Sequence, residues 1–282
     1  MDELTRRGVR VSVALARTLG LRVADPLVLR DVSNLLVHLR PAPVVARVAT
    51  STALARVDVV EHFRRAVDVT AYLAARGVPV VGASDEIPAG PFTRDGMVVS
   101  FASWVPHDPT WVPTEFAHRL AELHTELASY PGSLPARGPL TDVDAARALW
   151  TRPASELEAF TAVRDCLAAH WPTDDVQPLH GDAHPGNLLM TPRGPLWNDF
   201  EDTWRGPVTW DLACLALTGR LDGMAAAGDY PLPRGDLAFF LRLRRLQAAG
   251  WLTILEQRFP EYRDAADEQL DAALVPPVER RH

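Results

Sequence analysis

The sequence contains no lysine, so all 29 residues counted as Lys or Arg are arginines. This absence excludes a Walker-A phosphate loop, which ends in Gly-Lys followed by Ser or Thr. It also excludes a lysine that forms a Schiff base with pyridoxal phosphate. Any basic side chain that holds a phosphate must therefore be an arginine, whose planar guanidinium pairs with phosphate oxygens and stays ionised.

Cysteines and long apolar segments are also scarce. Cys166 and Cys214 lie far apart and lack the spacing of a metal site, so we expect free, buried thiols in a reducing cytoplasm. No apolar run approaches the ~20 residues of a membrane helix. Arg10 and Arg17 interrupt the apolar residues 9–21, which makes this segment a poor secretion signal. We expect a cytoplasmic protein with no membrane partner.

The formal net charge is −7, which argues against a nucleic-acid partner because nucleic-acid-binding proteins usually carry a basic surface. An acidic surface is compatible with a cationic small molecule, and equally with a surface that only favours solubility. The 282 residues, 47% of them hydrophobic, are enough for a large core in one domain or two. The composition does not indicate an oligomeric state.

The first part of the chain predicts a mixture of helices and strands. Apolar positions at helical spacing predict a helix over 4–20, which ends at Gly20, and a second over 57–76, which ends at Gly77. Short runs typical of strands occur at 27–29, 35–39, 44–48, 78–81 and 97–103.

Residues 104–112 form a proline-containing connector, and the pattern beyond it is helical. Residues 130–139 are predicted to be a loop, and helices are predicted around 116–127, 157–167, 210–217, 236–257 and 260–273. The sequence therefore predicts an α+β protein of two lobes, with a small mixed β/α N-terminal lobe at 1–104 and a mostly helical C-terminal lobe at 105–282.

The most informative segment is His180-Gly181-Asp182-Ala183-His184-Pro185-Gly186-Asn187, which Asp199 follows twelve residues later. Phosphoryl transfer from a nucleotide needs a group that orients the attacking hydroxyl and oxygen ligands that hold Mg²⁺ against the phosphates. The spacing from Asp182 to Asn187 equals that of the protein-kinase catalytic loop, and Asp199 takes the place of the metal-binding aspartate. We therefore expect Asp182 to be the catalytic base, and Asn187 and Asp199 to be metal ligands.

The residues between the two proposed metal ligands predict a small hairpin. The apolar run 188–190 is followed by the turn Thr191-Pro192-Arg193-Gly194 and then by Leu196 and Trp197. Such a hairpin would fold Asp199 back toward Asn187. Beyond it, Asp211 begins a predicted helix, and we expect it either to cap that helix or to brace the catalytic loop through backbone N–H groups.

A competing hypothesis interprets the same segment as a metal site. His180, Asp182 and His184 alternate, so on an extended strand all three would face one side and could bind Zn²⁺ or Mn²⁺ as in a metallohydrolase. Pro185-Gly186 directly after His184 argues against a long strand there.

Arg47 is a charged residue inside an apolar strand, which is costly unless the charge is paired. Nucleotide phosphates and a carboxylate on the following helix are its expected partners, and Glu61 is the only glutamate on that helix. No GxGxxG loop is present. Phosphates are instead expected near Ser33 and Asn34 in the first hairpin turn, and adenine near the backbone of Ser103, Trp104 and Val105.

These residues resemble the aminoglycoside phosphotransferase family, which has a protein-kinase-like fold. The resemblance rests on the segment 180–187, on Asp199-Phe200-Glu201 and on Trp210-Asp211-Leu212-Ala213, and it extends to 44–48, 76–80 and 119–124. It implies the same roles for Asp182, Asn187 and Asp199, and a contact from Arg47 to the α- and β-phosphates. The family often has lysine in place of Arg47 and glutamate in place of Ala66, so the sequence departs from it at the phosphate clamp.

The resemblance implies an ATP- or GTP-dependent and Mg²⁺-dependent phosphotransferase that acts on a hydroxyl group of a small molecule. The leading acceptor is an antibiotic such as an aminoglycoside, whose O-phosphorylation would confer resistance. An endogenous alcohol or sugar, as in choline, homoserine or sugar kinases, is the main alternative. A nucleotide-binding pseudokinase or regulatory module is a third hypothesis, because the phosphate clamp departs from the family.

Overall fold

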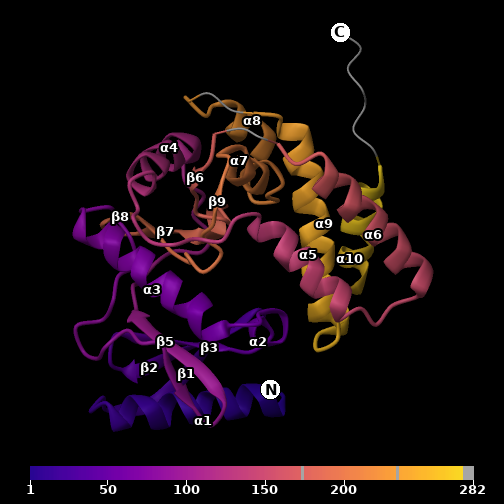
Figure 1. The fold of residues 1–282 in the computed structure, drawn as a ribbon. Helices are drawn as coiled ribbons and strands as arrows, with labels where there is room; N and C mark the ends of the chain where they lie inside the picture. The colour runs from indigo at the N-terminus through magenta and orange to yellow at the C-terminus, as the bar shows by residue number, and fades with distance from the viewer. Residues whose placement is uncertain (173–174, 233–234, 276–282) are drawn as a thin grey trace. The chain divides into compact units, whose positions relative to one another are not determined.

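The computed structural model describes residues 1–172, 175–232 and 235–275. These residues form two compact units, and the chain enters each unit more than once (Figure 1). Unit 1 comprises Met1–Pro113, Tyr130–Gly132 and Pro185–Thr203, and unit 2 comprises the described parts of Thr114–Ser129, Ser133–His184 and Trp204–His282. The lobes at 1–104 and 105–282 remain a prediction, and the segment Pro185–Thr203 joins the N-terminal unit.

Unit 1 is built on a five-stranded antiparallel sheet with the strand order β1-β2-β3-β5-β4. Its strands are β1 (Val23–Asp31), β2 (Asn34–Pro41), β3 (Val44–Ala49), β4 (Phe92–Arg94) and β5 (Met97–Ser103). Four of them lie where strands are predicted, whereas β4 lies in a segment predicted to be a loop. The predicted strand at 78–81 is reduced to a single bridge between Val80 and Trp197.

Helix α1 (Glu3–Thr18) covers one face of this sheet (Figure 1). Asp2 begins the helix by accepting the backbone N–H of Thr5 at 2.7 Å. Val11 and Leu15 of α1 pack against inward-facing residues of the strands. These include Leu35, Val37, Leu39 and Val48. This face of the sheet is therefore the apolar core of unit 1.

Helix α3 (Val59–Ala75) belongs to the opposite face, where Phe63 packs on Val98 of β5. Side chains alternate between the two faces of a strand. Because Val48 points into the core under α1, its neighbour Arg47 points to the α3 face. Arg47 pairs in register with Ser100 of β5.

The remaining elements of unit 1 are short. They are α2 (Thr52–Ala55), the 3-10 helix η1 (Pro185–Asn187) and the hairpin of β7 (Leu188–Thr191) and β8 (Gly194–Trp197). The hairpin and the turn within it lie where the sequence predicts them.

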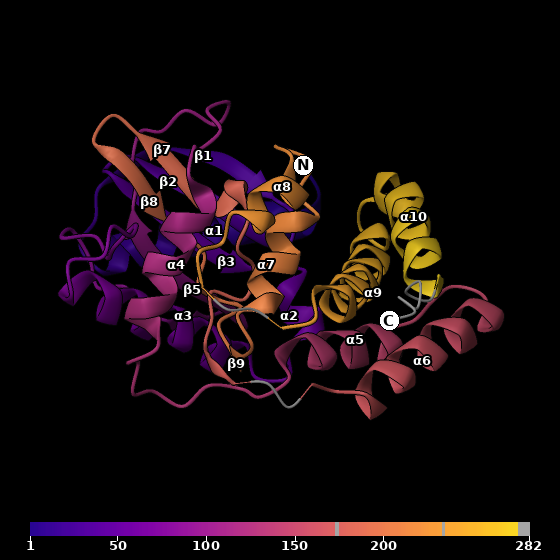
Figure 2. The same cartoon turned by 90° about the horizontal axis from the view of Figure 1, so that it is seen from above.

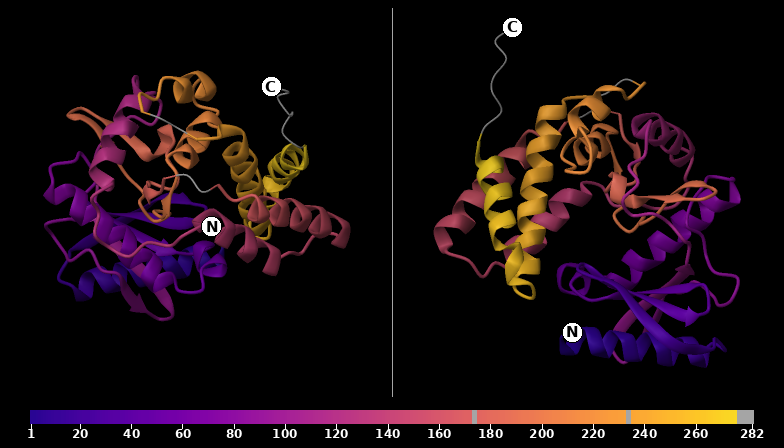
Figure 3. Two further views of the ribbon diagram at one scale, coloured as in Figure 1. Left: turned by 45° about the horizontal axis from the view of Figure 1, so that its top comes forward. Right: turned by 180° about the vertical axis from the view of Figure 1, so that it is seen from behind.

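Unit 2 is mostly helical, as predicted (Figure 2 and Figure 3). Its long helix α9 packs against α5, α6, α7 and α10. The helices are α4 (Phe116–Leu127), α5 (Gly138–Ala148), α6 (Ala154–Ala169), α7 (Thr209–Ala216), α8 (Gly223–Gly228), α9 (Leu237–Glu256), η2 (Pro260–Tyr262) and α10 (Arg263–Leu274), with a small strand pair of β6 (Gln177–Pro178) and β9 (Arg205–Gly206). The α+β fold class is confirmed.

Helix α5 is absent from the sequence predictions, although a signal for it exists. Leu140, Val143 and Ala146 are all buried and recur every three residues, which is the spacing of a helix face.

Both cysteines are free, as predicted, and Cys214 is buried, whereas Cys166 is exposed and not buried as predicted. Within the described ranges, no helix has the length and apolar character needed to cross a bilayer.

Gly250 lies on α9, close to α5 and α6. A Cβ atom at this position would lie 2.8 Å from the Cβ of Ala146 and 3.2 Å from the Cζ of Phe160. Gly250→Val should therefore lower the free energy of unfolding by about 1–3 kcal/mol, as measured by chemical denaturation. Ala248→Val, at a half-exposed position of the same helix, is the matched control and should cost less than about 1 kcal/mol. Equal losses in both variants would show that close helix packing does not explain this glycine.

Candidate functional site

The β7–β8 hairpin brings the two predicted metal ligands near one another. Asn187 directly precedes β7 and is buried. The backbone N–H of Asn198, just after β8, donates to the carbonyl of Asn187 at 2.9 Å. The hairpin therefore places Asn187 beside the residue that precedes Asp199, as the sequence predicts.

Asp199 has an unusual backbone conformation, with φ at 69°. Residues other than glycine seldom adopt positive φ, and where they do the site is often functional. The Asp199 carboxylate and the Asn187 side-chain carbonyl are both hard oxygen donors of the kind that Mg²⁺ prefers. The chemistry of these two residues therefore fits a magnesium ion held together with phosphate oxygens.

Arg47 forms ion pairs with two carboxylates of the same segment. Its Nη1 lies 2.6 Å from Oδ1 of Asp199 and 2.9 Å from Oε2 of Glu201. Burial alone would lower the pKa of Arg47, but the two carboxylates outweigh it and raise this pKa above its usual value. Arg47 is therefore a permanent positive charge in the sheet.

Glu201 is held more tightly than Asp199. The Asn34 amide Nδ2 donates to both of its carboxylate oxygens, at 2.9 and 2.8 Å, and Nε2 of His62 lies 3.8 Å from Oε2. Burial and the nearby charge of Asp199 raise the pKa of Glu201 above its usual value, and Arg47 opposes this shift.

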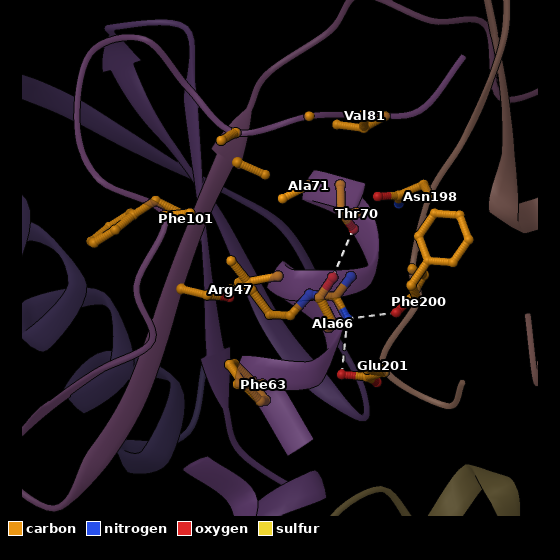
Figure 4. Close-up of a pocket in the computed structure, with 17 residues that line it drawn as sticks. Arg47, Phe63, Ala66, Thr70, Ala71, Val81, Phe101, Asn198, Phe200 and Glu201 are labelled. Carbon is orange, nitrogen blue, oxygen red and sulfur yellow. Dashed lines mark hydrogen bonds and ion pairs between the residues drawn. The ribbon is translucent and has the colours of Figure 1, made fainter. Parts of the chain in front are cut away.

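A cavity of about 170 Å³, open to solvent, borders this cluster (Figure 4). Its lining residues all belong to unit 1. Arg47, Asp199 and Glu201 supply the charged part of the lining, and the apolar part includes Phe63, Val67, Ala71, Val81 and Phe101. Apolar walls with a few converging charged groups are typical of a small-molecule site.

The predicted partner of Arg47 needs correction. Glu61 pairs instead with Arg64, at 2.6 Å, and the side chains of both are half-exposed. The reason is its place in the first turn of α3, where its own backbone N–H is capped by Asp58 at 3.0 Å. Arg47 takes its carboxylates from the segment after β8 and not from this helix.

Ser33 lies in the first hairpin turn, as predicted, and Asn34 is the first residue of β2. The amide of Asn34 binds Glu201, and the carbonyl of Ser33 accepts the backbone N–H of Thr52 at 2.8 Å. A phosphate contact from either residue remains a prediction.

The predicted adenine segment is also partly engaged. The backbone N–H of Ser103 donates to Gly82 and that of Trp104 to Pro43, at 3.0 and 2.8 Å. The carbonyl of Val105 lies 3.0 Å from Nδ1 of His107. An adenine contact in this segment remains a prediction, and the backbone amides of Ser103 and Trp104 already have partners.

In unit 2, Asp211 of α7 braces the catalytic loop. Its carboxylate accepts the backbone N–H groups of His180 and Gly181, each at 2.9 Å. Its Oδ2 also lies 2.8 Å from Nε2 of the buried His124 on α4. Trp210 adds a hydrogen bond from its ring N–H to the carbonyl of Gly181, at 2.7 Å. Of the two roles predicted for Asp211, the bracing role is confirmed.

Asp182, the predicted base, follows this braced pair and forms ion pairs with two side chains of unit 2. Nη2 of Arg244 lies 2.5 Å from Oδ1, and Nε2 of His184 lies 3.4 Å from Oδ2. Burial by itself would raise the pKa of Asp182, but Arg244 and His184 outweigh it and hold this pKa well below its usual range. Asp182 is therefore ionised across the physiological range.

Arg244 is a site residue that the sequence analysis does not find. It lies on α9, its guanidinium carbon is 5.9 Å from the centre of the Trp210 ring, and its Nη1 donates to Gln247 at 2.6 Å. Gln247 in turn donates to the buried Asp142 at 2.6 Å. These contacts fix the guanidinium beside Asp182.

The alternative metal set of His180, Asp182 and His184 does not form. Gly181 has a φ of 91°, which breaks the extended strand that this hypothesis requires. His180 is fully buried and its Nδ1 accepts the backbone N–H of Asp182 at 3.3 Å. Across the described ranges, no group of three His, Cys, Asp or Glu side chains is arranged to hold a metal ion.

Solved structures with the same fold include several kinases. Amicoumacin kinase hAmiN, in complex with AMP-PNP, Ca²⁺ and Ami, superimposes with a TM-score of 0.72 at 12% identity, over 97% of this chain and 96% of the kinase. Choline kinase LicA from Streptococcus pneumoniae superimposes with a TM-score of 0.64 at 17% identity, over 94% of this chain and 99% of the kinase. APH(2")-IIia, in complex with GDP and kanamycin, has a TM-score of 0.63 at 15% identity, over 93% of this chain and 97% of its own. The protein-kinase-like fold is thus confirmed.

No curated protein matches the sequence. A family model described as "Phosphotransferase enzyme family" matches residues 27–234, which include every strand of the unit 1 sheet except the start of β1, together with both halves of the site. A match over well more than half of the chain shows that it belongs to this family of phosphotransferases, which act on hydroxyl groups of small molecules.

Proposed function

We propose that this chain transfers the terminal phosphoryl group of ATP or GTP, together with Mg²⁺, to a hydroxyl of a small molecule, with an antibiotic as the leading acceptor. The observation that carries the proposal is the ion pair of Arg47 with Asp199 beside a cavity of unit 1. A buried cation and an adjacent carboxylate with a hard oxygen are the two groups that a nucleotide–magnesium complex requires.

On the nucleotide side, Arg47 would bind phosphate oxygens, and Asn187 and Asp199 would hold Mg²⁺. When bound, the ion supplies positive charge that offsets the charge on the phosphates. Phosphate oxygens compete with Asp199 for Arg47, so nucleotide binding frees the Asp199 carboxylate to act as a ligand.

On the acceptor side, Asp182 would accept a hydrogen bond from the acceptor hydroxyl and so orient its oxygen. That oxygen forms a bond to the terminal phosphorus while the bond to the nucleoside diphosphate breaks, and Asp182 receives the proton. A carboxylate whose pKa is held low is a weak base. Its main contribution is therefore orientation, with proton transfer late in the step, as suits a loose transition state.

An endogenous alcohol or sugar is the second candidate acceptor, and Arg244 favours it. A cationic group on the acceptor next to the reacting hydroxyl would meet the positive charge of Arg244, which lies 2.5 Å from Asp182. An antibiotic would have to keep its charged groups away from this position. Choline and aminopropanol, the acceptors in the names of two kinases with the same fold, carry a cationic nitrogen close to their hydroxyl, so Arg244 favours a neutral alcohol or sugar over these two.

A panel of antibiotics and small alcohols tests the proposal, with release of nucleoside diphosphate and product mass as the readouts. At least one acceptor should gain a phosphoryl group. Asp182→Asn should lower turnover of that acceptor by about 10²–10⁴-fold, because the hydroxyl is no longer oriented by a carboxylate. Nucleotide affinity should stay nearly unchanged. Nucleotide binding without turnover of any acceptor would favour the pseudokinase hypothesis, and turnover near wild type in the variant would remove Asp182 from its role.

Asp199→Ala should reduce the Mg²⁺-dependent part of nucleotide affinity, because it removes a charged oxygen ligand. Titration with a fluorescent nucleotide, with Mg²⁺ and with a chelator, measures the ratio of the two affinities. Asp202→Asn removes a nearby carboxylate that pairs with Arg56 at 2.6 Å, and this control should keep the wild-type ratio. The assignment of Asp199 fails if the ratio is equal in wild type and Asp199→Ala.

Arg244→Met should raise the pKa of Asp182 toward its ordinary value, because the nearest positive charge is removed. Asp182 acts as a carboxylate, so kcat/KM falls as the pH drops through its pKa. The methionine variant should lose kcat/KM at a higher pH than wild type. Arg244→Lys keeps the charge and should follow wild type more closely. Identical acid limbs in all three proteins would mean that Arg244 does not control this ionisation.

A further inference from the structure

The side chains of helix α3 that lie beside Arg47 at the cavity are uncharged, and none of them is a carboxylate. Ala66 and Thr70 are the residues of this helix that line the cavity beside Arg47, together with Phe63, Val67 and Ala71 (Figure 4). Thr70 donates its hydroxyl to the carbonyl of Ala66, at 2.8 Å. A buried arginine still needs a carboxylate on its guanidinium, so another element must provide it.

Glu201 meets that need with a fixed geometry. Its carboxylate is 2.9 Å from Nη1 of Arg47 and its side chain is only 9% exposed. Asn34, at the start of β2, donates to both carboxylate oxygens. The strand β3 therefore fixes Arg47, and the first residue of β2 fixes Glu201.

The two carboxylates at Arg47 differ in a way that separates their roles. The side chain of Asp199 is 29% exposed and has the positive φ of a strained site. The oxygens of Glu201 are occupied by Asn34 and Arg47. Asp199 can exchange Arg47 for a metal ion, whereas Glu201 would have to give up three hydrogen bonds to do so.

We propose that Glu201 is the positioning residue that holds Arg47 for the nucleotide phosphates, in the role that a carboxylate on α3 would otherwise have. This inference rests on the proposed function, because it assigns a partner within the nucleotide half of the same site. Glu201 contacts the phosphate-binding side chain and touches neither the phosphates nor the metal. Its contribution is to nucleotide affinity through Arg47.

The test is nucleotide binding by the full chain with Glu201→Gln, followed by transfer of the carboxylate to α3. Loss of the charge should weaken nucleotide binding by at least about tenfold, while the ratio of affinities with and without Mg²⁺ stays at the wild-type value. Ala66 and Arg47 line the same cavity, so Ala66→Glu placed in the Glu201→Gln chain should recover most of the lost affinity. Ala66→Glu alone measures the effect of the added charge.

Circular dichroism melting of each variant shows whether it is folded. If Glu201→Gln does not fold, Asn34→Ala keeps the carboxylate but removes its support, and it should weaken nucleotide binding without changing the Mg²⁺ ratio. Unchanged affinity in a folded Glu201→Gln or Asn34→Ala chain overturns the inference. If Mg²⁺ no longer increases nucleotide affinity in Glu201→Gln, Glu201 is a metal ligand, and this result overturns the inference as well.

The outcomes also separate this inference from the function on which it rests. A wild-type chain that binds no nucleotide overturns both. A wild-type chain that binds nucleotide and transfers phosphoryl groups, beside a Glu201→Gln chain that binds equally well, overturns the inference alone. Loss of affinity that Ala66→Glu does not recover shows that Glu201 acts through the local fold, and this too overturns a positioning role.

Discussion

The positive charge of Arg47 in an apolar sheet is the constraint on which the nucleotide half of the site depends. A buried guanidinium is costly without carboxylate partners, and α3 presents Ala66 and Thr70 to the cavity. Asp199 and Glu201 satisfy it from 152 and 154 positions further along the chain. Both carboxylates lie in the segment Pro185–Thr203, which belongs to the same compact unit as the N-terminal sheet.

The unit boundary between His184 and Pro185 divides the catalytic motif in two. Each half is organised by its own network. Asp182 is fixed within the helical unit, by the Asp211 brace on the loop and by Arg244 on α9. Asn187 and Asp199 are fixed within the sheet unit by the β7–β8 hairpin. The residues proposed to hold nucleotide and metal, and the residue proposed to orient the acceptor, are thus stabilised separately, each within its own unit.

Local features of this fold could be predicted from the sequence, and distant pairings could not. The β7–β8 hairpin follows from short spacings and turn residues, whereas the sequence leaves open whether Asp211 caps its helix or braces the loop at His180. The partner of Arg47 does not, because proximity in sequence favours Glu61 while the fold supplies Glu201. Arg244 is one of three arginines within four residues of α9, and helical periodicity alone does not distinguish it. Only the tertiary structure places it at Asp182.

The choice of arginine at position 47 is compatible with carboxylate partners that lie beyond α3. The terminal nitrogens of arginine lie one bond further from the backbone than the lysine ammonium, and the guanidinium offers five N–H donors in a plane. The longer side chain carries its charge past Ala66 to the segment after β8, where Asp199 and Glu201 lie. A carboxylate on α3 is then unnecessary, because one guanidinium nitrogen already contacts both. Arginine at position 47 and alanine at position 66 are therefore compatible in one arrangement, in which Glu201 and the proposed metal ligand Asp199 lie on a single segment of chain.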